Sequence, residues 1–277
     1  MDEAYLKEMF DLEGKVAVVT GGSGVLGSAI CWGLARLGTR IAILNRTPKA
    51  GQDLAKEINA RGGQALAFPC DVTVKDNLEQ AAEAILDAFG QVDILINGAG
   101  GNRPEATTGP EQSFFDLPPE AIQAVLDLNW TGTVLASQVF GRSMAARGEG
   151  AILNIVSVSA FRPLTRVGAY SAAKAAVWNF TRWLAVHMAQ EYSPRIRVNA
   201  LAPGFFLTAQ NRYLLVDETT GNLTSRGRQI LAHTPMGRFG VPDDLIGAVV
   251  WLVSPAASFV TGIVVPVDGG FLAYAGV

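Results

Sequence analysis

The chain has 277 residues, of which 49% are hydrophobic and 17% charged, and its formal net charge is −3. This length suits one large α/β domain with a sizeable core. The mild acidity argues against a nucleic-acid or anionic-membrane surface, because such surfaces are normally basic. An acidic N-terminal stretch does not fit a secretory signal, and no apolar run approaches the roughly 18 residues of a membrane span. Two cysteines, Cys31 and Cys70, are too few for a disulfide framework or a structural zinc site, so we expect a soluble cytoplasmic enzyme without a bound metal.

Apolar runs and amphipathic stretches alternate along the chain. The apolar runs predict strands, at residues 15–20, 40–44, 65–68, 92–100, 150–160, 195–204 and 262–270. The intervening stretches predict helices, at residues 25–37, 49–61, 74–89, 119–146, from about 170 onward, and 242–254. Strands that are apolar throughout and alternate with helices are typical of a parallel sheet covered on both faces. We expect a Rossmann-type, doubly wound α/β fold with about seven strands.

The chain shows no repeat, low-complexity tract or linker, so we expect residues 1–277 to form a single domain. One irregular region lies at residues 205–235, where polar residues are scattered among apolar ones. This length is long for a plain connection, and the strand before it should end beside the cofactor crevice of such a sheet. We therefore expect a substrate lid or loop here, with a surface excursion as the alternative.

The first predicted strand runs into a glycine-rich turn within VAVVTGGSGVLGSAI, residues 16–30. Its G-x-G-x-x-G pattern is weak evidence alone, but a strand before it and a helix after it are the context of a dinucleotide-binding loop. Glycines let the backbone approach a pyrophosphate, whose charge the helix N-terminus stabilises. We expect this loop to bind a dinucleotide through Gly21, Ser23, Gly24, Val25, Leu26 and Gly27.

The end of the second strand should contact the adenosine ribose. An acid at this point is typical of NAD binding, whereas this chain has Asn45 followed by Arg46. Arg46 could pair with the 2′-phosphate of NADP, and Asn45 would not repel it. This favours NADP(H) over NAD(H). The alternative is that Arg46 is solvated and Asn45 hydrogen-bonds the ribose of NAD.

Ser157, Tyr170 and Lys174 form the candidate catalytic set. Tyr170 and Lys174 stand four residues apart at the start of a predicted helix, on one face, and Ser157 lies at the end of the fifth strand. Moving a hydride between an alcohol carbon and nicotinamide requires the hydroxyl proton to move too. A free phenol titrates at about 10, and a nearby ammonium and the positive nicotinamide would lower that pKa. We expect Tyr170 to act as general acid and base, Lys174 as its electrostatic partner and a ribose ligand, and Ser157 as the ligand of the substrate oxygen.

With these motifs, the chain resembles the short-chain dehydrogenases/reductases over about residues 12–272. The resemblance rests on motifs in the order and spacing of that family, namely Thr20-Gly21…Gly27, Asp71-Val72, Asn97-Gly98-Ala99-Gly100, Asn129, Ser157, Tyr170-x-x-x-Lys174, Pro203-Gly204…Thr208 and Val267-Asp268-Gly269-Gly270. The chain departs from the family pattern at Val25, where glycine is usual, and at Gly98, where a second asparagine is usual.

The resemblance implies which residues hold the cofactor besides the glycine loop. These are Asp71 and Val72 at the adenine, Asn97, Ala99 and Gly100 beside the central strand, and Pro203, Gly204 and Thr208 flanking the nicotinamide. It also implies that Asn129 anchors a water in a proton relay to Lys174. Finally it implies a homotetramer, in which helices around residues 119–146 and 170–189 pack against a neighbouring copy.

Within the family, five segments are similar to the D-mannonate oxidoreductase group: TGGSGVLG, NGAGGN, LTAQN, LAHTPMGRFG and VDGGFLAYAGV. That similarity implies interconversion of D-fructuronate and D-mannonate, or of a similar sugar acid. A sugar-acid carboxylate would pair with arginine through two parallel hydrogen bonds. Arg103 and Arg212 are the leading candidates, Arg162 and Arg166 are further ones, and Asn102 and Ser159 could meet substrate hydroxyls. For each single arginine, a solvated loop position is the alternative.

Two other functions stay open. The chain could reduce another carbonyl class, such as gluconate-type acids or 3-ketoacyl thioesters, or it could be a non-catalytic dinucleotide-binding regulator. The combination of Ser157, Tyr170 and Lys174 speaks against the regulator, because a sensor needs no proton relay. We therefore expect an NAD(P)(H)-dependent oxidoreductase that acts on a secondary alcohol or ketone, with neither a nucleic acid nor a membrane as partner.

Overall fold

The computed structural model describes residues 2–208, 212–217 and 219–276. Its sheet consists of β1 (Val16–Thr20), β2 (Arg40–Asn45), β3 (Gln64–Pro69), β4 (Ile94–Asn97), β5 (Gly150–Ile155), β6 (Ile196–Pro203) and β7 (Val264–Val267). All pairs are parallel, and the seven strands follow the order β3-β2-β1-β4-β5-β6-β7. The order reverses between β1 and β4, which is where a doubly wound sheet opens a crevice at the carboxyl ends of its strands.

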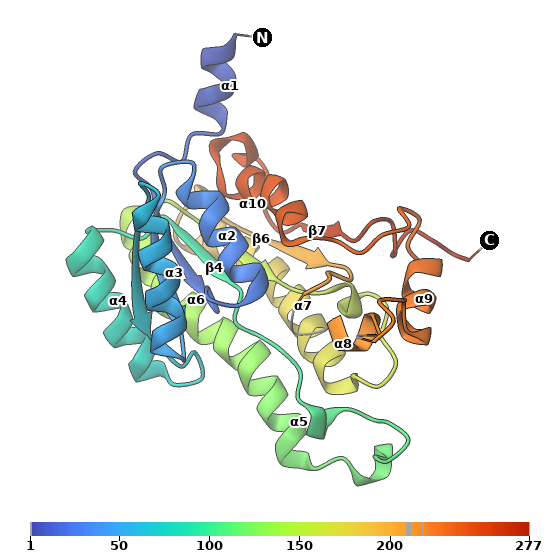
Figure 1. The fold of residues 1–277 in the computed structure, drawn as a ribbon. Coiled ribbons are helices and arrows are strands. Elements are labelled where there is room, and N and C mark those ends of the chain that lie inside the picture. Colours follow the sequence, from blue (N-terminus) through green and yellow to red (C-terminus); the bar gives the residue numbers. More distant parts are fainter. Residues whose placement is uncertain (1, 209–211, 218, 277) are drawn as a thin grey trace.

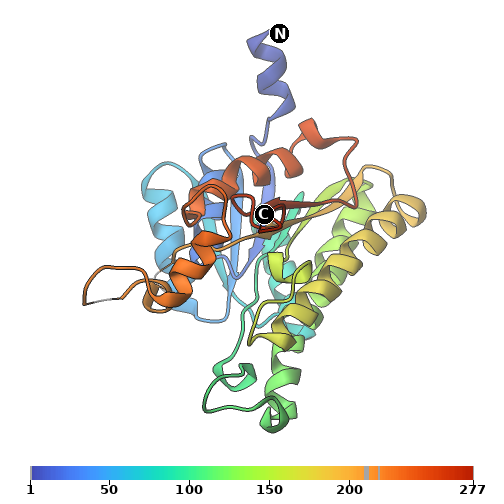
Figure 2. The same ribbon diagram turned by 90° about the vertical axis from the view of Figure 1, so that its right-hand side faces the viewer.

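Long helices cover both faces of the sheet (Figures 1 and 2). One face carries α2 (Val25–Ala35), α3 (Pro48–Ala60) and α10 (Ile246–Val253), and the other carries α4 (Lys75–Phe89), α6 (Gly132–Arg147) and α7 (Gly168–Glu191). Successive strand residues serve opposite faces: Ala17 and Val19 pack with the first group of helices, and Val16 and Val18 with the second. Each strand residue is therefore buried on one face or the other, which explains why the strands are apolar throughout.

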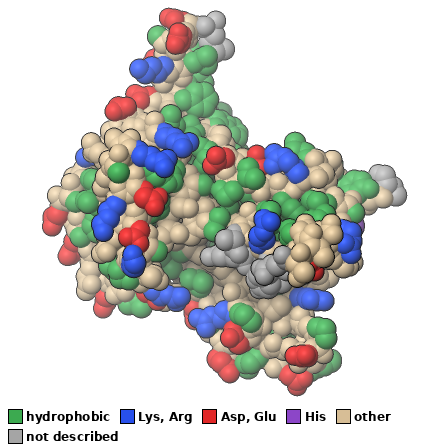
Figure 3. All heavy atoms as spheres, viewed as in Figure 1, with side chains coloured by type: hydrophobic (Ala, Val, Ile, Leu, Met, Phe, Trp, Pro, Cys, Tyr) green, Lys and Arg blue, Asp and Glu red, His purple; other side chains and the backbone are tan. Residues whose placement is uncertain are grey.

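Shorter elements lie in the connections and at the edges. They are α1 (Glu3–Met9), η1 (Pro104–Ala106), η2 (Phe114–Asp116), α5 (Pro119–Leu126), η3 (Asp127–Thr131), η4 (Val158–Ala160), α8 (Arg212–Leu215), α9 (Ser225–Ala232), η5 (Pro242–Leu245) and η6 (Pro255–Ala257). Helix α1 projects from the body, and the loop before α5 forms a second projection at the far end (Figures 1 and 2). Acidic and basic side chains are interspersed over the face of the molecule that Figure 3 shows. Within the described residues, no helix combines the length and the apolar character that crossing a membrane requires.

The predicted doubly wound fold with seven strands is confirmed. The largest difference concerns the helix expected at residues 119–146, which consists of α5, the π-helical turn η3 and α6 in succession. A π turn places one more residue in the turn than an α-helix does, and such turns are frequent at functional sites. Here the π turn contains Asn129. The helix expected at residues 25–37 is shorter, because it ends at Ala35.

The segment predicted as a lid or loop, residues 205–235, lies beyond the carboxyl end of β6, and its residues 209–211 and 218 lie outside the described part of the chain. It contains the short helices α8 and α9, and its start is attached to the core. The N–H of Leu207 donates to the carbonyl of Gly240 (3.0 Å), whose own N–H donates to the carbonyl of Phe205 (2.9 Å). The segment is thus fixed at its beginning, next to the carboxyl edge of the sheet.

Candidate active site

A cavity of about 540 Å³ opens at the carboxyl ends of β1, β4, β5 and β6. It brings together many of the residues that the sequence predicted: Gly21, Gly24 to Gly27, Ala99, Gly100, Asn102, Ser157, Tyr170, Lys174, Pro203, Gly204 and Thr208. These residues come from separate loops that each follow a strand, because the carboxyl ends of parallel strands meet at one edge of the sheet.

The glycine loop between β1 and α2 is shaped by close backbone packing. Gly21 has a φ of 65°, and a Cβ there would lie 2.8 Å from the Cα of Ala99. A Cβ at Gly27 would collide with the carbonyl oxygen of Gly21. Only glycine fits at these two positions, since the backbone of the β4 loop and of the turn itself occupies the space of a side chain.

The start of α2 fits a pyrophosphate. Gly24 is the N-cap residue and provides no capping side chain, and the first turn of α2 contains no acid. Val25, Leu26 and Gly27 line the cavity, and the N–H groups of a first helical turn have no intrahelical acceptor. Those free N–H groups and the positive end of the helix dipole suit the negative charge of a dinucleotide. Val25, which stands where the family usually has glycine, is the first residue of the helix and leaves this cradle open.

Sequence reasoning gave no role to Thr20, the last residue of β1. Its Oγ1 accepts hydrogen bonds from the N–H groups of Gly98 and Ala99, both at 3.1 Å. Thr20 therefore fixes the loop after β4 against the glycine loop. The position of Thr20 next to Gly21, at the end of a strand that faces a second glycine-rich loop, was the signal that could have revealed it.

Ser157, Tyr170 and Lys174 all line the cavity. The Nζ of Lys174 donates to the carbonyl of Ile155 (2.8 Å) and lies 5.7 Å from the centroid of the Tyr170 ring. The Ser157 hydroxyl hydrogen-bonds the phenol of Tyr170, and its Oγ also accepts from the N–H of Ser159 (3.2 Å). A hydroxyl, a phenol and an ammonium are thus within reach of one another at the end of β5.

Burial changes the acidity of both titratable groups in this set. It raises the pKa of Tyr170, and the hydrogen bond with Ser157 opposes that rise. It lowers the pKa of Lys174 from 10.5 to about 8. Both groups are therefore driven toward their neutral forms in the protein alone, because a buried site disfavours charge. A phenolate at Tyr170 needs additional positive charge in the cavity.

Asn129 is fully buried in the π turn. Its Nδ2 donates to the carbonyls of Gly101 (2.7 Å) and Val125 (2.8 Å), and its Oδ1 accepts from the N–H of Gly101 (3.1 Å). A Cβ at Gly100 would lie 2.6 Å from this Oδ1 and 3.0 Å from the Nζ of Lys174. The polar ends of Asn129 and Lys174 therefore flank Gly100, and only a residue without a side chain keeps the space between them open.

The edge expected to contact the ribose and adenine lies at the ends of β2 and β3. Asn45 is buried, and its Nδ2 donates to the carbonyl of Thr47, whereas Arg46 is exposed. Hydrogen bonds from the hydroxyl and N–H of Thr73 lower the pKa of Asp71, and the charge of Arg46 adds to this effect. Val72 is buried against Gly132 of α6. Asn45 thus shapes the turn into α3, and Arg46 is the cation at this edge.

Asn97, the last residue of β4, has 2% of its surface exposed and is not among the described residues that line the cavity. Its Nδ2 donates to the Oγ of Ser137 (3.0 Å) and to the Oδ1 of Asn154 (2.8 Å), whose own Nδ2 donates to the Oγ1 of Thr181 (2.9 Å). Asn97 therefore connects β4 with β5 and with helices on one face of the sheet. Ser23 of the glycine loop is half-buried and is not among the described residues that line the cavity.

The predicted substrate residues differ in their placement. Asn102 lines the cavity, although its Nδ2 is engaged by the Oγ1 of Thr107 (2.7 Å). Arg103 is exposed next to Asn102, and its guanidinium has no hydrogen bond or ion pair with any described residue. Ser159 is buried, and its Oγ lacks a hydrogen-bond partner in the described part of the chain. Arg212 is exposed on α8. Neither arginine is among the described residues that line the cavity.

The other two arginines of interest lie between Ser157 and Tyr170. Arg166 has a φ of 76°, and its carbonyl accepts from the N–H of Thr108 (3.0 Å). The guanidinium of Arg162 is already engaged, because its NH1 donates to the carbonyl of Tyr274 at 2.8 Å.

Phe206, which sequence reasoning did not select, lines the cavity from the start of segment 205–235.

A family comparison agrees with this geometry. The family model of the short chain dehydrogenases matches residues 15–218. The chain belongs to the short chain dehydrogenase family. As such it is an NAD(P)-dependent oxidoreductase, and the glycine-lined cavity at the start of α2 is suited to that cofactor.

Three proteins illustrate where this short chain dehydrogenase stands in its family. It is 54% identical to the uncharacterized oxidoreductase UxuB of Bacillus subtilis (strain 168), over 96% of this chain and 98% of that protein. The crystal structure of a candidate D-mannonate oxidoreductase from Haemophilus influenza, with bound NAD, has a TM-score of 0.92 and 45% identity, covering 96% of this chain and 98% of that one. A gluconate 5-dehydrogenase from Burkholderia cenocepacia J2315, in complex with NADP and tartrate, has a TM-score of 0.86 and 31% identity, covering 98% of this chain and 100% of that one.

Proposed function

We propose that this short chain dehydrogenase interconverts a secondary alcohol and a ketone of a sugar acid of the D-mannonate/D-fructuronate type, with Tyr170 as general acid and base. The observation that carries the chemistry is the convergence of Ser157, Tyr170 and Lys174 on one cavity beside the glycine loop. When bound, a nicotinamide cofactor supplies or accepts the hydride. The protein then needs only to hold the substrate oxygen and to move one proton.

The residues of the chain divide this task between them. In the reducing direction the Ser157 hydroxyl donates a hydrogen bond to the carbonyl oxygen, and the Oη of Tyr170 transfers its proton to that oxygen. The Lys174 ammonium, 5.7 Å from the ring, stabilises the phenolate that remains. Lys174 is charged below a pH of about 8, so its support is greatest at and below neutral pH. We assign to Asn129, on the other side of Gly100, the role of holding a water that restores the proton.

Two solved relatives, and an arginine beside the cavity of this chain, support the proposal of a sugar-acid substrate. One solved relative is a candidate D-mannonate oxidoreductase and another is a gluconate 5-dehydrogenase that holds tartrate, a small dicarboxylate. In this chain the exposed Arg103 follows Asn102, which lines the cavity, and the guanidinium of Arg103 has no partner among the described residues. A free guanidinium beside a cavity can pair with a substrate carboxylate. We assign Arg103 this role, with Arg212 as the second candidate.

An assay panel tests the proposed function. Hexuronates, aldonates, neutral polyols and 3-ketoacyl thioesters are offered with each cofactor, and kcat/KM is measured from the change in cofactor absorbance. Tyr170→Phe should lower kcat by about 10³-fold, because proton transfer loses its donor, while the Kd of the reduced cofactor stays unchanged. Tyr5→Phe, at an exposed tyrosine of α1, is the matched control. Turnover that survives in Tyr170→Phe would remove Tyr170 from its role, and a wild type that binds cofactor but converts no carbonyl would favour the regulator.

For the cofactor we propose NADP(H) in preference to NAD(H). Asn45 and Arg46 at the end of β2 provide no carboxylate, and the exposed Arg46 is the cation that can meet a 2′-phosphate. The crystal structure from Haemophilus influenza holds NAD, and the gluconate 5-dehydrogenase holds NADP, so the two relatives differ in the cofactor that they hold. The preference of this chain therefore depends on its own residues at this edge.

We further propose a homotetramer that associates through α6 and α7. Trp183, Val186 and Tyr192 on and just after α7 each have 56% of their surface exposed, and the rings of Trp183 and His187 stack at 4.8 Å. Exposed aromatic surface of this kind is typical of interfaces. Light scattering should give four times the chain mass of 29.3 kDa, whereas a monomer mass would contradict the assignment. The place of action in the cytoplasm stays a prediction.

A further inference from the structure

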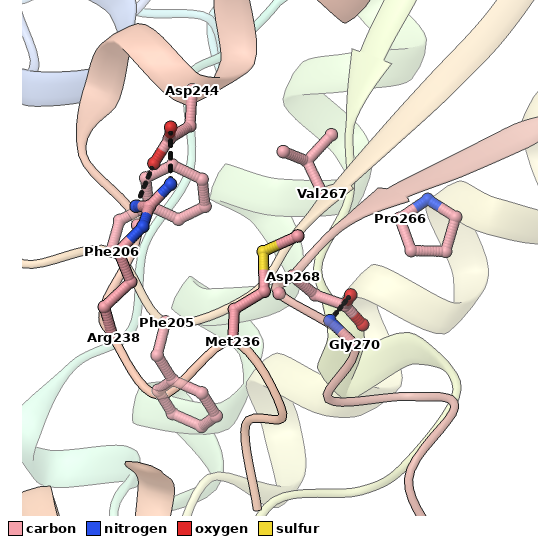
Figure 4. Close-up of a pocket in the computed structure, with 11 residues that line it drawn as sticks. Phe205, Phe206, Met236, Arg238, Asp244, Pro266, Val267, Asp268 and Gly270 are labelled. Atoms are coloured by element: carbon pink, nitrogen blue, oxygen red, sulfur yellow. Dashed lines mark hydrogen bonds and ion pairs between the residues drawn. The ribbon is translucent and has the colours of Figure 1, made fainter.

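Residues 268–274 lie between two parts of the molecule that are distant in the sequence. On one side is the end of segment 205–235, and on the other is the loop that follows Ser157. Figure 4 shows part of this arrangement, with Phe205, Met236, Asp268 and Gly270 around a cavity of about 410 Å³. We call residues 268–274 the clasp, because its contacts with both sides are specific.

The clasp has a defined internal structure. The Oδ1 and Oδ2 of Asp268 accept hydrogen bonds from the N–H groups of Gly270 (2.9 Å) and Leu272 (2.8 Å). The N–H groups of Ala273 and Tyr274 both donate to the carbonyl of Gly270 at 3.1 Å. A carboxylate that binds two successive turns of backbone orders a short segment that lacks a helix or strand. The clasp is therefore a fixed shape that can position other groups.

Aromatic and backbone contacts connect the clasp to segment 205–235. The ring of Phe271 meets that of Phe205 edge to face at 5.2 Å, and the ring of Tyr274 meets His233 at 6.3 Å. The N–H of Met236, the residue directly after the segment, donates to the carbonyl of Gly269 (3.1 Å). Phe205 lies at the start of the segment and His233 directly after α9, so the clasp contacts both ends of it.

Arg162 connects the clasp to the loop that follows Ser157. Its NH1 donates to the carbonyl of Tyr274 at 2.8 Å and, more weakly, to that of Phe271 at 3.5 Å. The N–H of Arg162 donates to the carbonyl of Val158 (3.0 Å), the residue after Ser157. A charged donor makes a stronger hydrogen bond to a carbonyl than a neutral one does.

We propose that the clasp holds segment 205–235 in register with the loop that contains Ser157, and that Arg162 is the positioning residue that closes it. Phe206 and Thr208 of the segment line the same cavity as Ser157 and Tyr170. Loss of the clasp therefore changes how the substrate is held, while the glycine loop and the cofactor cradle stay as they are. The proposal rests on the proposed function only for its kinetic readout. It also assigns Arg162 to the protein's own carbonyls and not to a substrate carboxylate.

Amide hydrogen exchange on the full chain, measured by mass spectrometry without substrate, tests the clasp directly. In Arg162→Ala we expect exchange in α9 to rise about tenfold, which corresponds to the loss of one charged hydrogen-bond donor. Arg162→Lys should show a smaller rise, because an ammonium can still reach one carbonyl. Tyr274→Ala keeps the carbonyl that Arg162 binds but loses the ring beside His233, and it should also raise exchange in α9.

Arg40→Ala is the matched control. Arg40 also donates from its guanidinium to a backbone carbonyl, that of Gly14 (3.1 and 3.3 Å), but at the amino end of β2, which is separated from β7 by four strands of the sheet. Arg40→Ala should leave amide exchange in α9 unchanged. In the Arg162 and Tyr274 variants, amide exchange in α2 should stay at its wild-type rate. Unchanged exchange of α9 in either Arg162→Ala or Tyr274→Ala would overturn the proposal.

Kinetics separate a positioning role from a purely structural one. The clasp predicts that Arg162→Ala raises KM for acidic and neutral substrates alike, by about tenfold. A rise in KM confined to carboxylate substrates, together with unaltered exchange in α9, would make Arg162 a substrate ligand and would refute the clasp. Because the exchange measurement needs no substrate, it decides the clasp even if no sugar acid is converted.

Discussion

The two sides of the active-site cavity are built in different ways. The cofactor side consists of loops packed closely on one another: the Thr20 hydroxyl accepts from the N–H groups of Gly98 and Ala99, and Gly21 and Gly27 leave no room for a side chain. The side that we propose for the substrate consists of segment 205–235 and the loop after Asn102, which are connected to the rest of the molecule by individual hydrogen bonds and ring contacts. The first side requires particular residue types, whereas the second requires particular partners.

This difference explains why a family can keep one cofactor site and change its substrate. Residues such as Gly21 tolerate almost no replacement, because the backbone of a neighbouring loop fills the space. Exposed arginines on loops can be exchanged at little cost in stability. If exposed arginines bind the substrate, as we propose, then the choice of substrate depends on contacts that are energetically small. Most of the predictions below therefore change one side of the cavity and use the other as a reference.

Among the variants that test this contrast, the largest effect should come from Gly100→Ala on the cofactor side. A methyl group there would lie 2.6 Å from the Oδ1 of Asn129 and 3.0 Å from the Nζ of Lys174. Asn129 is held by three hydrogen bonds and has little room to move, so Lys174 must shift. We expect kcat/KM to fall by about 10²-fold or more, as displacements of about 1 Å do at other active sites.

Gly247→Ala in α10 provides the control for this prediction, because a Cβ at Gly247 meets nothing within 4 Å and Gly247 is not among the described residues that line the cavity. It should retain wild-type kcat/KM with every substrate. Equal activity of the two alanine variants would show that the space between Asn129 and Lys174 is not needed for the reaction, and the contrast between the two sides of the cavity would lose its main support.

The sequence predicted the cofactor side more fully than the substrate side, because close backbone packing restricts which residue types can stand there. Glycines at fixed spacing after an apolar strand have few uses other than a close backbone approach, so the roles expected of Gly21 and Gly27 follow from local pattern. The π turn at Asn129 left no local signal, because its neighbours in the sequence have ordinary helical composition. The engagement of Arg162 by Tyr274 depends on residues more than a hundred positions apart, which no local pattern encodes.

The next largest effect should come from Arg46→Ala at the edge of the cofactor side. If Arg46 pairs with a 2′-phosphate, the variant should raise KM for NADPH about tenfold and leave KM for NADH nearly unchanged. Lys56→Ala, at an exposed lysine of α3, controls for the loss of a positive charge in this region. A wild type that prefers NAD(H) clearly would remove Arg46 from the site and leave Asn45 as the residue that shapes this edge.

On the substrate side, Arg103→Ala should raise KM for sugar acids about fivefold to tenfold, which is the size expected for a solvent-accessible charged pair. KM for neutral polyols and for the cofactor should change little, since neither carries a carboxylate at this position. The measurement is a pair of KM values on one protein preparation. Equal changes for acidic and neutral substrates would exclude Arg103 as the carboxylate ligand and leave Arg212 as the candidate to examine.

The last prediction concerns stability, not kinetics, and tests whether Lys174 loses its proton on folding. Its pKa is lowered by burial from 10.5 to about 8, so between these pH values the unfolded chain holds a proton that the folded chain has released. Stability then rises with pH in this window, by up to about 1.4 kcal/mol per pH unit. Urea denaturation at pH 7, 8, 9 and 10 should therefore show the wild type gaining stability relative to Lys174→Met above pH 8 and not below it. Parallel curves for the two proteins across the whole range would mean that Lys174 keeps its charge despite burial, and the proton relay would then have to work with a permanently charged lysine.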